Sequence, residues 1–309
     1  MKLRIIQNRK YYYAFSGLLF LASIFSLIAW GLKPGLDFTG GSLLDVSFNA
    51  SRPHNTEVQQ VLAPLNLGDI MIQPAGDKDI IIRFKTVDEP THQQILSTLN
   101  DKFKPAGATS TKAVMEQRFE SVGPVIGQEL ENKAWMAIIL ASLCIIIYIA
   151  IAFRRASKPV VSWKYGLAAI IALIHDITIV AGLFSILGHF AGVEVDSLFI
   201  TALLTVMGFS VHDTIVVFDR TRENLFKHYS GSFEDVVNDS VNQTMTRSIN
   251  TSLTVLLVLF SLYALGGDTV KNFILALLFG IAIGTYSSVF VASPIIVDWN
   301  LFDRKLKNK

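Results

Sequence analysis

Six long apolar stretches constrain the fold of this chain more than any other feature. A helix needs about 20 consecutive, mostly apolar residues to cross the hydrocarbon core of a bilayer. The stretches that reach or approach this length are residues 13–32, 134–153, 163–187, 198–218, 249–265 and 273–297. Only 17% of the 309 residues are charged, whereas about a quarter are charged in an ordinary soluble protein. We therefore expect a polytopic α-helical membrane protein with six transmembrane helices.

The basic residues indicate how these helices are oriented. They precede the first stretch and follow the second, fourth and sixth, and they are Lys2, Arg4, Arg9, Lys10, Arg154, Arg155, Lys158, Arg220, Arg222, Lys227, Arg304, Lys305, Lys307 and Lys309. The short connections on the other side carry Glu194, Asp196 and Asp268, with Lys271 as their one basic residue. Because lysine and arginine are enriched in cytoplasmic loops, we expect both termini to be cytoplasmic.

The same assignment divides the chain into four parts. Residues 1–33 form the N-terminus and the first helix, which lacks a small-residue cleavage site and is expected to be an uncleaved anchor. Residues 34–132 form a translocated domain. Residues 133–299 contain helices two to six with a cytoplasmic loop at about 220–246, and residues 300–309 form a cytoplasmic tail.

The translocated segment has the pattern of a small α+β domain. Strands are expected at 43–48, 70–73, 80–84 and 111–119, and helices at 55–65, with Asn55 as N-cap, and at 91–103. The order β-α-β-β-α-β is that of the ferredoxin-like arrangement.

The segment before the fifth apolar stretch and the last apolar stretch each have a pattern that indicates how they pack. Residues 222–245 combine polar and apolar positions, so part of this segment is expected to be an amphipathic helix. The last apolar stretch carries Ala276, Gly280, Gly284 and Ser288 at four-residue spacing. Small residues at this spacing allow a second helix to approach closely, either within the same bundle or at a subunit interface.

Ionisable residues lie inside three of the apolar stretches or at their ends. They are His175 and Asp176 in the third, His212 and Asp213 in the fourth, and Arg247 just before the fifth. A charged group at this depth costs about 2.5 kcal/mol or more and by default suggests a function. We expect Asp213 and Arg247 to pair inside the bundle, since each would reduce the cost of burying the other.

Polar residues extend from these charges along two helix faces. One face holds Ser210, Asp213 and Thr214, with His212 about 100° away, where it would act as a modulator. The other face follows i, i+3, i+4, i+7 spacing and consists of Arg247, Asn250, Thr251 and Thr254. If the two faces meet, they form a hydrated polar track in which a carboxylate can carry protons. One proton crossing about 150 mV would release roughly 3.5 kcal/mol.

Other classes of function have less support from the residues. A static buried ion pair is the main alternative to a proton relay, and binding of a substrate or a metal is a third. Asp176 and Asp213 lack the Gly-x-Gly-Asp pattern of intramembrane proteases, and no nucleotide-binding motif is present, so we expect neither an enzyme nor an organic cofactor. The single cysteine, Cys144, favours no structural metal site, and a net charge of +2 does not favour nucleic acid.

Five motifs resemble those of the SecF family, and they follow one another in order over most of the chain. They are residues 35–41, with Asp37, Gly40 and Gly41, and residues 121–124, 172–176, 213–220 and 247–252. The resemblance places the chain in the resistance-nodulation-division superfamily and identifies Asp213 and Arg247 with the proton-pathway residues of the family. The chain departs from the family at His212, where asparagine is common, and this departure adds a titratable neighbour.

The resemblance also implies partners and a location. Members of the family pair with SecD, act beside the SecYEG channel, and use the proton gradient to draw preproteins to the periplasmic side of the bacterial inner membrane. Residues 34–132 would then be periplasmic, and protons would be the coupling ion. Two other functions are weighed against this one: half of a proton-driven exporter of small molecules or lipids, and a scaffold that transports nothing.

Overall fold

The structure is a computed structural model, and it describes residues 3–49, 51–104, 112–152, 160–227 and 231–307. The chain forms two compact units, Met1–Lys33 with Ala134–Lys309, and Pro34–Lys133. Some predicted features lie outside the described residues: Lys2, Thr111, Phe153, Arg154, Arg155, Lys158 and Lys309.

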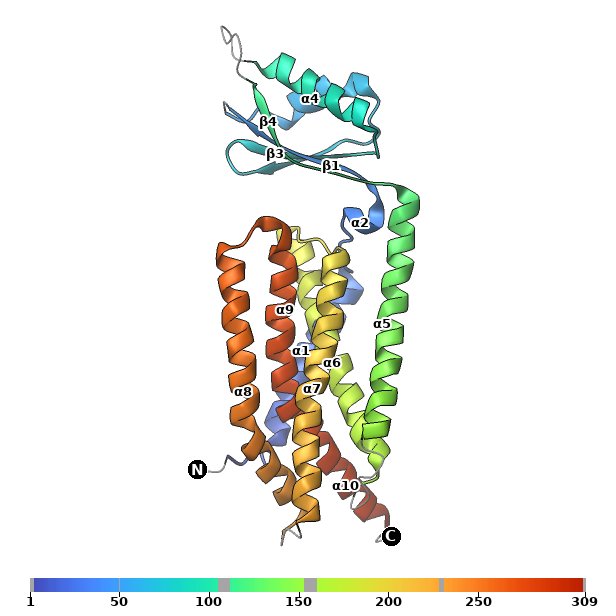
Figure 1. The fold of residues 1–309 in the computed structure, drawn as a ribbon, viewed down its shortest axis with the longest axis vertical. Helices are drawn as coiled ribbons and strands as arrows, with labels where there is room; N and C mark the ends of the chain where they lie inside the picture. The colour runs from blue at the N-terminus through green and yellow to red at the C-terminus, as the bar shows by residue number, and fades with distance from the viewer. Residues whose placement is uncertain (1–2, 50, 105–111, 153–159, 228–230, 308–309) are drawn as a thin grey trace. The chain divides into compact units, whose positions relative to one another are not determined.

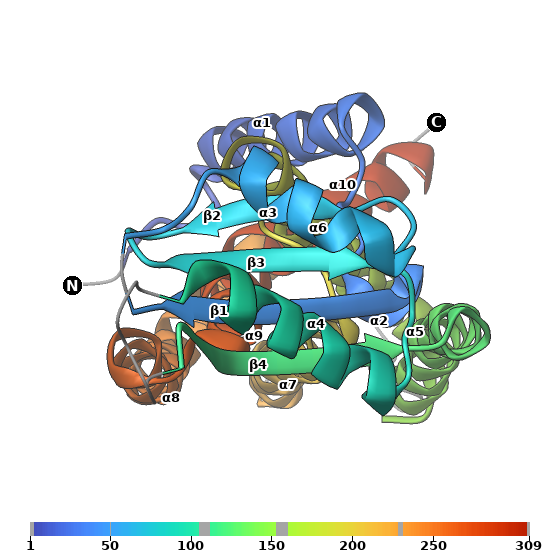
Figure 2. The ribbon, with the colours of Figure 1, turned by 90° about the horizontal axis from the view of Figure 1, so that it is seen from above.

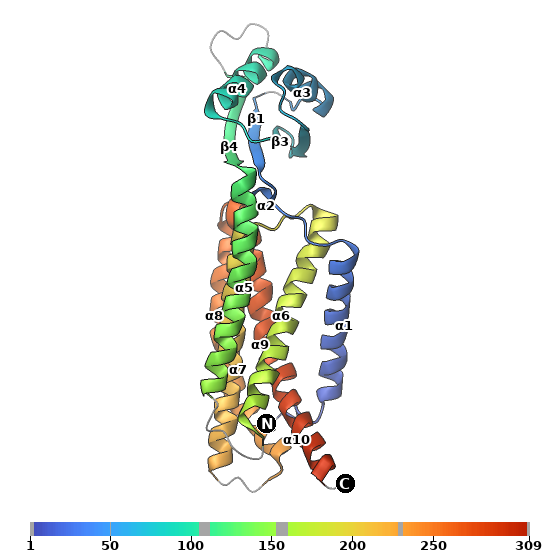
Figure 3. The same cartoon turned by 90° about the vertical axis from the view of Figure 1, so that its right-hand side faces the viewer.

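Six helices within the described part of the chain are long and apolar enough to cross a membrane, as predicted. They are α1 (Arg9–Ala29), α5 (Pro124–Ala152), α6 (Ser162–Ala191), α7 (Ser197–Phe226), α8 (Phe233–Leu265), and a composite last span that begins with α9 (Asp268–Ser287). Figure 1 shows α7, α8 and α9 side by side, and Figure 3 shows α1 beside α6. In the last span, a π-helical segment η2 (Ser288–Ala292) joins α9 to α10 (Ser293–Lys307).

The segment predicted as a loop at 220–246 is largely helical. Helix α7 continues to Phe226, and α8 already begins at Phe233, where Ser232 and Asp235 form a reciprocal capping box. The first turns of α8 bury Val237 and Val241 in the core of the bundle. This apolar face is the amphipathic helix expected within 222–245, and its burial explains why the helix extends well beyond the apolar stretch that begins at Ile249.

The small-residue ridge of the last span packs inside the bundle. A Cβ atom added to Gly280 would lie 2.2 Å from Val206 Cγ2, and one added to Gly284 would lie 3.0 Å from Ser210 Cβ. Ala276 and Ser288, at the ends of the ridge, are also buried. Of the two interpretations of the ridge, the structure supports packing within the bundle, where α9 and α7 lie in close contact.

The chain before α1 is held by two asparagines of α8, Asn238 and Asn242, and Asn242 both accepts a hydrogen bond from the Leu3 N–H and donates one to the Leu3 carbonyl (2.9 Å each). The side-chain oxygen of Asn238 accepts hydrogen bonds from the backbone N–H groups of Ile5 (3.0 Å) and Ile6 (3.2 Å), and its amide nitrogen donates to the Leu3 carbonyl (3.0 Å). Ile5 and Ile6 are buried beneath it. The N-terminal segment is therefore a packed part of the helical unit.

The second unit is a four-stranded antiparallel sheet with helices on one face (Figure 2). The strand order is β2-β3-β1-β4, which confirms the ferredoxin-like arrangement. The elements are α2 (Leu36–Thr39), β1 (Gly41–Phe48), α3 (Asn55–Leu62), η1 (Ala63–Leu65), β2 (Met71–Ala75), β3 (Asp79–Phe84), α4 (Glu89–Phe103) and β4 (Val114–Val122). Side chains of β1 and β3 pack against α3 and α4 to form the core.

Two helix starts in this unit differ from the predictions. Asn55 is the first residue of α3 and not its N-cap, and its amide nitrogen instead reaches the Ile72 carbonyl at 3.4 Å. Helix α4 begins at Glu89, two residues before the predicted Thr91, because the Asp88 carboxylate accepts a hydrogen bond from the Thr91 N–H.

A substitution on the ridge tests the packing of α9 on α7. Gly280→Ala should lower the free energy of unfolding by about 1–3 kcal/mol, since the new methyl group meets the buried side chain of Val206. Thermal unfolding in detergent would measure the loss, and adding Val206→Ala should recover part of it. An unchanged stability in the single variant would contradict the close approach.

Candidate functional site

Two carboxylates lie buried in the helical unit, on neighbouring helices. Asp176 lies on α6 and is 0% exposed, and Asp213 lies on α7 and is 2% exposed. Uncompensated charges are expensive in a bilayer, so the groups around each carboxylate determine what the site can do.

Asp176 is fully satisfied by donors from three helices. Its Oδ2 accepts hydrogen bonds from the hydroxyls of Ser210 on α7 (2.6 Å) and Ser287 on α9 (2.7 Å). Its Oδ1 lies 2.9 Å from Nδ1 of His175 on its own helix. Hydrogen bonds to a charged group are among the stronger ones, so this carboxylate links α6, α7 and α9.

His175 is buried between Asp176 and the first helix. Its ring stacks on Phe20 of α1, with the ring centroids 6.0 Å apart and the planes 12° from parallel. Its Nε2 atom is buried and has no hydrogen-bond partner among the described residues. One ring nitrogen of His175 therefore contacts the carboxylate, and the other has no hydrogen-bond partner among the described residues.

Asp213 is less completely satisfied. Ser248 of α8 and Thr285 of α9 lie beside its carboxylate, yet its Oδ2 atom and the Ser248 hydroxyl are both buried without a hydrogen-bond partner in the described part of the chain. His212 Nδ1 lies 3.9 Å from Asp213 Oδ1. This site holds an acceptor and an unused hydroxyl in a buried environment.

The predicted ion pair between Asp213 and Arg247 is not formed within the described residues. Arg247 lies on the exposed face of α8, near enough for its charge to act on Asp213. Asn250, Thr251 and Thr254 are exposed on the same helix. The residues of α8 that turn toward α7 and α9 are Ser248 and Ser252, and the Ser252 hydroxyl lies 2.5 Å from that of Thr285.

The two predicted polar faces therefore do not meet within this chain. Ser210 bonds to Asp176, and the Thr214 hydroxyl donates to the Ser210 carbonyl one turn earlier on its own helix. The predicted residues of α8 are instead exposed, together with residues of α7 outside its predicted face, and we call the two sets the outward polar stripe. It consists of Thr201, Thr205, Gly208 and His212 on α7 and Arg247, Asn250, Thr251 and Thr254 on α8.

The predicted polar track contains Ser210 but not the other hydroxyl groups near the carboxylates, those of Ser248, Thr285 and Ser287. Ser248 and Ser252 have i, i+4 spacing on α8 and are buried. This spacing was available in the sequence, but the neighbouring residues Arg247, Asn250 and Thr251 form a more polar stripe, and the prediction followed that stripe.

The glycine motif at the start of the second unit makes a tight junction. Asp37 lies in the short helix α2, which ends at Gly40 with φ 68° and ψ 177°, a conformation that essentially only glycine adopts. A Cβ on Gly40 would lie 2.9 Å from Pro124 Cα, and one on Gly41 would lie 3.0 Å from the Phe84 carbonyl oxygen. The motif therefore allows the backbone to enter β1 where it passes close to the beginning of α5.

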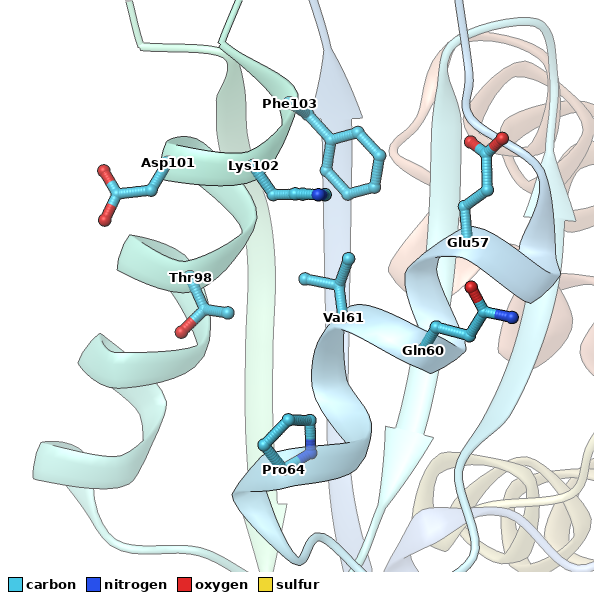
Figure 4. A pocket seen from close by; sticks show the side chains of 8 residues that line it. All are labelled: Glu57, Gln60, Val61, Pro64, Thr98, Asp101, Lys102 and Phe103. Carbon is cyan, nitrogen blue, oxygen red and sulfur yellow. The ribbon is translucent and has the colours of Figure 1, made fainter.

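A groove between α3 and α4 contains none of the predicted site residues. Its volume is about 770 Å³, and it is lined by Glu57, Gln60, Val61, Pro64, Thr98, Asp101, Lys102 and Phe103. Figure 4 shows Val61, Lys102 and Phe103 pointing into the space between the helices and Asp101 pointing away from it. No cluster of three potential metal ligands occurs in the described ranges.

Comparisons with known proteins agree with this architecture. A family profile described as "Protein export membrane protein SecD/SecF, C-terminal" matches residues 102–301, and one described as "SecD/SecF GG Motif" matches residues 25–51. The protein translocase subunit SecF of Thermobaculum terrenum is 43% identical and covers 96% of this chain and 93% of its own length. SecF of Synechocystis sp. is 39% identical, with 97% and 95% covered.

Solved structures show the same fold. The crystal structure of SecDF from Thermus thermophilus, described as a translocon-associated membrane protein, has a TM-score of 0.76 and 31% identity. The match covers 97% of this chain but 39% of that one, so the chain spans less than half of SecDF. A second SecDF structure, in a super-membrane-facing form, has a TM-score of 0.68 and 30% identity.

The six apolar helices and the antiparallel α+β unit thus define a multi-pass membrane protein of the transport class. Within that class, the matches to family and relatives are specific. The chain belongs to the SecD/SecF family of protein-export membrane proteins, and its full-length relatives are SecF subunits.

A pair of glycine substitutions tests the junction at the glycine motif. Gly40→Ala should lower stability by more than the roughly 1–3 kcal/mol that this glycine-only backbone conformation costs, because the methyl group also meets backbone atoms of α5. Gly76 also has a positive φ, of 77°, but no atom lies within 4 Å of an added Cβ, so Gly76→Ala should show the conformational cost alone. Equal losses in thermal unfolding would contradict the role of close approach.

Proposed function

We propose that the chain is the SecF half of a proton-driven machine that promotes preprotein export through the SecYEG channel. SecD supplies the other half of the membrane bundle, and the proton motive force supports translocation and release on the periplasmic side. The protein spans the bacterial inner membrane with both termini in the cytoplasm and residues 34–132 in the periplasm, in agreement with the distribution of basic residues.

The observation that carries this proposal is the outward polar stripe. Thr205 and His212 on α7 and Asn250 and Thr254 on α8 are exposed within helices long and apolar enough to cross a membrane. The Thr205 and Thr254 hydroxyls donate to carbonyls of their own helices, so His212 and Asn250 have the greater need of a polar environment. Polar side chains at membrane depth almost always face a protein interior or a water-filled cavity. A second helical subunit over α7 and α8 provides such an interior, and the similarity of this chain to part of the longer SecDF protein supports SecD as that subunit.

The chemistry follows from the position of Asp213, which lies close to His212 of this stripe and within reach of the charge of Arg247. The carboxylate is buried, its Oδ2 lacks a hydrogen bond within the described residues, and Arg247 lies outside contact distance. The site can neutralise Asp213 in two ways, by binding a proton or by bringing Arg247 into contact. Alternation between these two states would move a proton and shift α8 relative to α7, which couples the gradient to a conformational change.

Asp176 and His175 extend the relay into the bundle. Ser210 bonds to Asp176 and lies one turn before Asp213 on α7, so a change at either carboxylate acts on the same helix. Protons are the only coupling species that the proposal requires.

The two alternatives explain less of the structure. A small-molecule exporter half needs a substrate path, whereas the groove between α3 and α4 is open and lies far along the chain from the ionisable residues. A scaffold without transport explains the fully bonded Asp176 but not an acceptor left unsatisfied at Asp213.

Replacing Asp213 separates a proton carrier from a scaffold. Asp213→Asn should assemble normally with SecD and lose the gradient-dependent part of preprotein export, because the amide cannot bind and release a proton. Export would be measured in proteoliposomes or inverted vesicles with and without a proton gradient. Asp219→Asn is a matched control on the same helix, where Asp219 pairs with Arg222 at the exposed end. Unchanged gradient dependence in Asp213→Asn would make the buried charges structural.

A second substitution tests the partner surface directly. No atom of this chain lies within 4 Å of a Cβ added to Gly208, so Gly208→Trp should leave the chain folded. If SecD covers the stripe, the added bulk should weaken the complex about tenfold or more. Co-purification of SecD would measure the effect, with Ile139→Trp on the apolar, exposed surface of α5 as control. Full recovery of SecD with Gly208→Trp would place the interface elsewhere.

A further inference from the structure

The last membrane span changes its hydrogen-bonding pattern directly after a residue that bonds to Asp176. Helix α9 ends at Ser287, and the next five residues, Ser288–Ala292, form the π-helical segment η2. Segments of this kind are rare, and within α-helices they frequently occur at functional sites. Neither the polar stripe nor Asp213 explains why the helix widens at this point.

The local sequence gives a physical reason for the wider turn. Pro294 has no N–H group, and in a continuous α-helix its ring would clash with the carbonyl of Phe290. The π-helical segment places Pro294 in the first turn of α10, where a missing N–H is tolerated. The Ser293 hydroxyl donates to the Ser288 carbonyl at 2.8 Å and so bonds to a residue five positions earlier.

Ser287 has two acceptors for one hydroxyl proton. Its Oγ lies 2.7 Å from Asp176 Oδ2 and 3.1 Å from the Gly284 carbonyl oxygen. A serine hydroxyl can donate only once. When Asp176 is charged, the shorter bond to the carboxylate is favoured, and when Asp176 carries a proton, the hydroxyl is free to turn to the Gly284 carbonyl.

We propose that Ser287 is a positioning residue that transmits the charge state of Asp176 to the last membrane span, and that η2 is the point at which this span adjusts. The inference rests on the proposed function, because it assumes that Asp176 changes its charge during the cycle. The groups bonded to Asp176 in the described ranges are Ser287, Ser210 and His175, and His175 is the one titratable group among them.

Because of the position of Ser287, a conformational change in η2 can affect contacts on both sides of it along the last span. Thr285, two residues earlier, bonds to Ser252 and lies beside Asp213. Beyond η2, Asp298 of α10 binds Arg9 (2.7 Å) and Tyr13 (2.9 Å) of α1. A change in η2 therefore alters the carboxylate region on one side and the attachment of α1 on the other.

Neighbouring serines provide a matched pair of variants. Ser287 and Ser288 are both 0% exposed, but the Ser288 hydroxyl donates only to the Thr285 carbonyl of its own helix (2.9 Å). Ser287→Ala should reduce gradient-driven export about tenfold, the effect of losing one hydrogen bond to a charged group. Ser288→Ala should stay within about twofold of wild type, and Ser287→Thr, which keeps the hydroxyl, should recover export.

A distance measurement gives a readout that does not depend on export. In the complex with SecD, spin labels at Phe302 on α10 and Lys227 at the end of α7, both exposed, would report on the last span in a Cys144→Ser background. Asp176→Asn and Ser287→Ala should shift the label distance in the same way, and the double variant should shift it no further. Ser288→Ala should keep the wild-type distance.

The results that overturn the inference differ from those that overturn the proposed function. Equal effects of Ser287→Ala and Ser288→Ala, an unchanged label distance in Ser287→Ala, or additive shifts in the double variant would each reject Ser287 as the transmitting residue. Loss of gradient dependence in Asp213→Asn together with any of these results would leave the proton-driven function standing without this coupling. Retained gradient dependence in Asp213→Asn would reject both.

Discussion

A carboxylate inside a bilayer has to be solvated by the protein, and the arrangement of the helical unit follows from how it does so at Asp176. The two hydroxyls that bond to this residue come from α7 and α9, so these helices must approach α6 and each other closely. Gly280 and Gly284 make that approach possible, because any side chain at either position would push α7 away. The small-residue ridge and the buried charge therefore depend on each other. Without the ridge, the hydroxyls could not reach the carboxylate, and without the hydroxyls, the carboxylate would be too costly to bury.

Asp213 differs from Asp176 in how fully its carboxylate is hydrogen-bonded, and this difference gives the two carboxylates different roles. Asp176 is bonded to donors on three helices, whereas Asp213 has one carboxylate oxygen without a hydrogen bond among the described residues. A change of charge at Asp176 therefore acts directly on the helices that bond to it, while Asp213 is the carboxylate with room for a new partner, either a proton or a cation. Ser210, a donor to Asp176, lies three residues before Asp213 on α7, so both carboxylates act on the same helix.

Much of the architecture could be predicted from the sequence, because long apolar stretches, strand alternation and turn residues report directly on the membrane and on local backbone preference. The faces of α8 could not be predicted in the same way. Arg247 and Asn250 form the more polar stripe, yet Ser248 and Ser252 are the residues that face α7 and α9. Periodicity identifies a polar stripe on a helix but not the surface that this stripe contacts. In a chain that binds a partner, a helix can have one buried face inside its own bundle and a second face that is buried only in the complex. The helical extension from Phe233 was missed for a related reason, since its stability comes from burial of Val237 and Val241 against distant residues.

The hydrogen bonds between α8 and the segment before α1 have a consequence for how the protein is made. Leu3, Ile5 and Ile6 are held by Asn238, a residue more than 230 positions later in the chain. During synthesis α1 is made long before Asn238 of α8. The hydrogen bonds between Asn238 and the segment before α1 can therefore form only after the fifth span has been synthesised. A chain that stops early, or one whose first residues are blocked by a fused tag, leaves two isoleucines and three backbone groups without their partners. Residues 3–6 therefore reach their final hydrogen bonding only after α8 has joined the bundle.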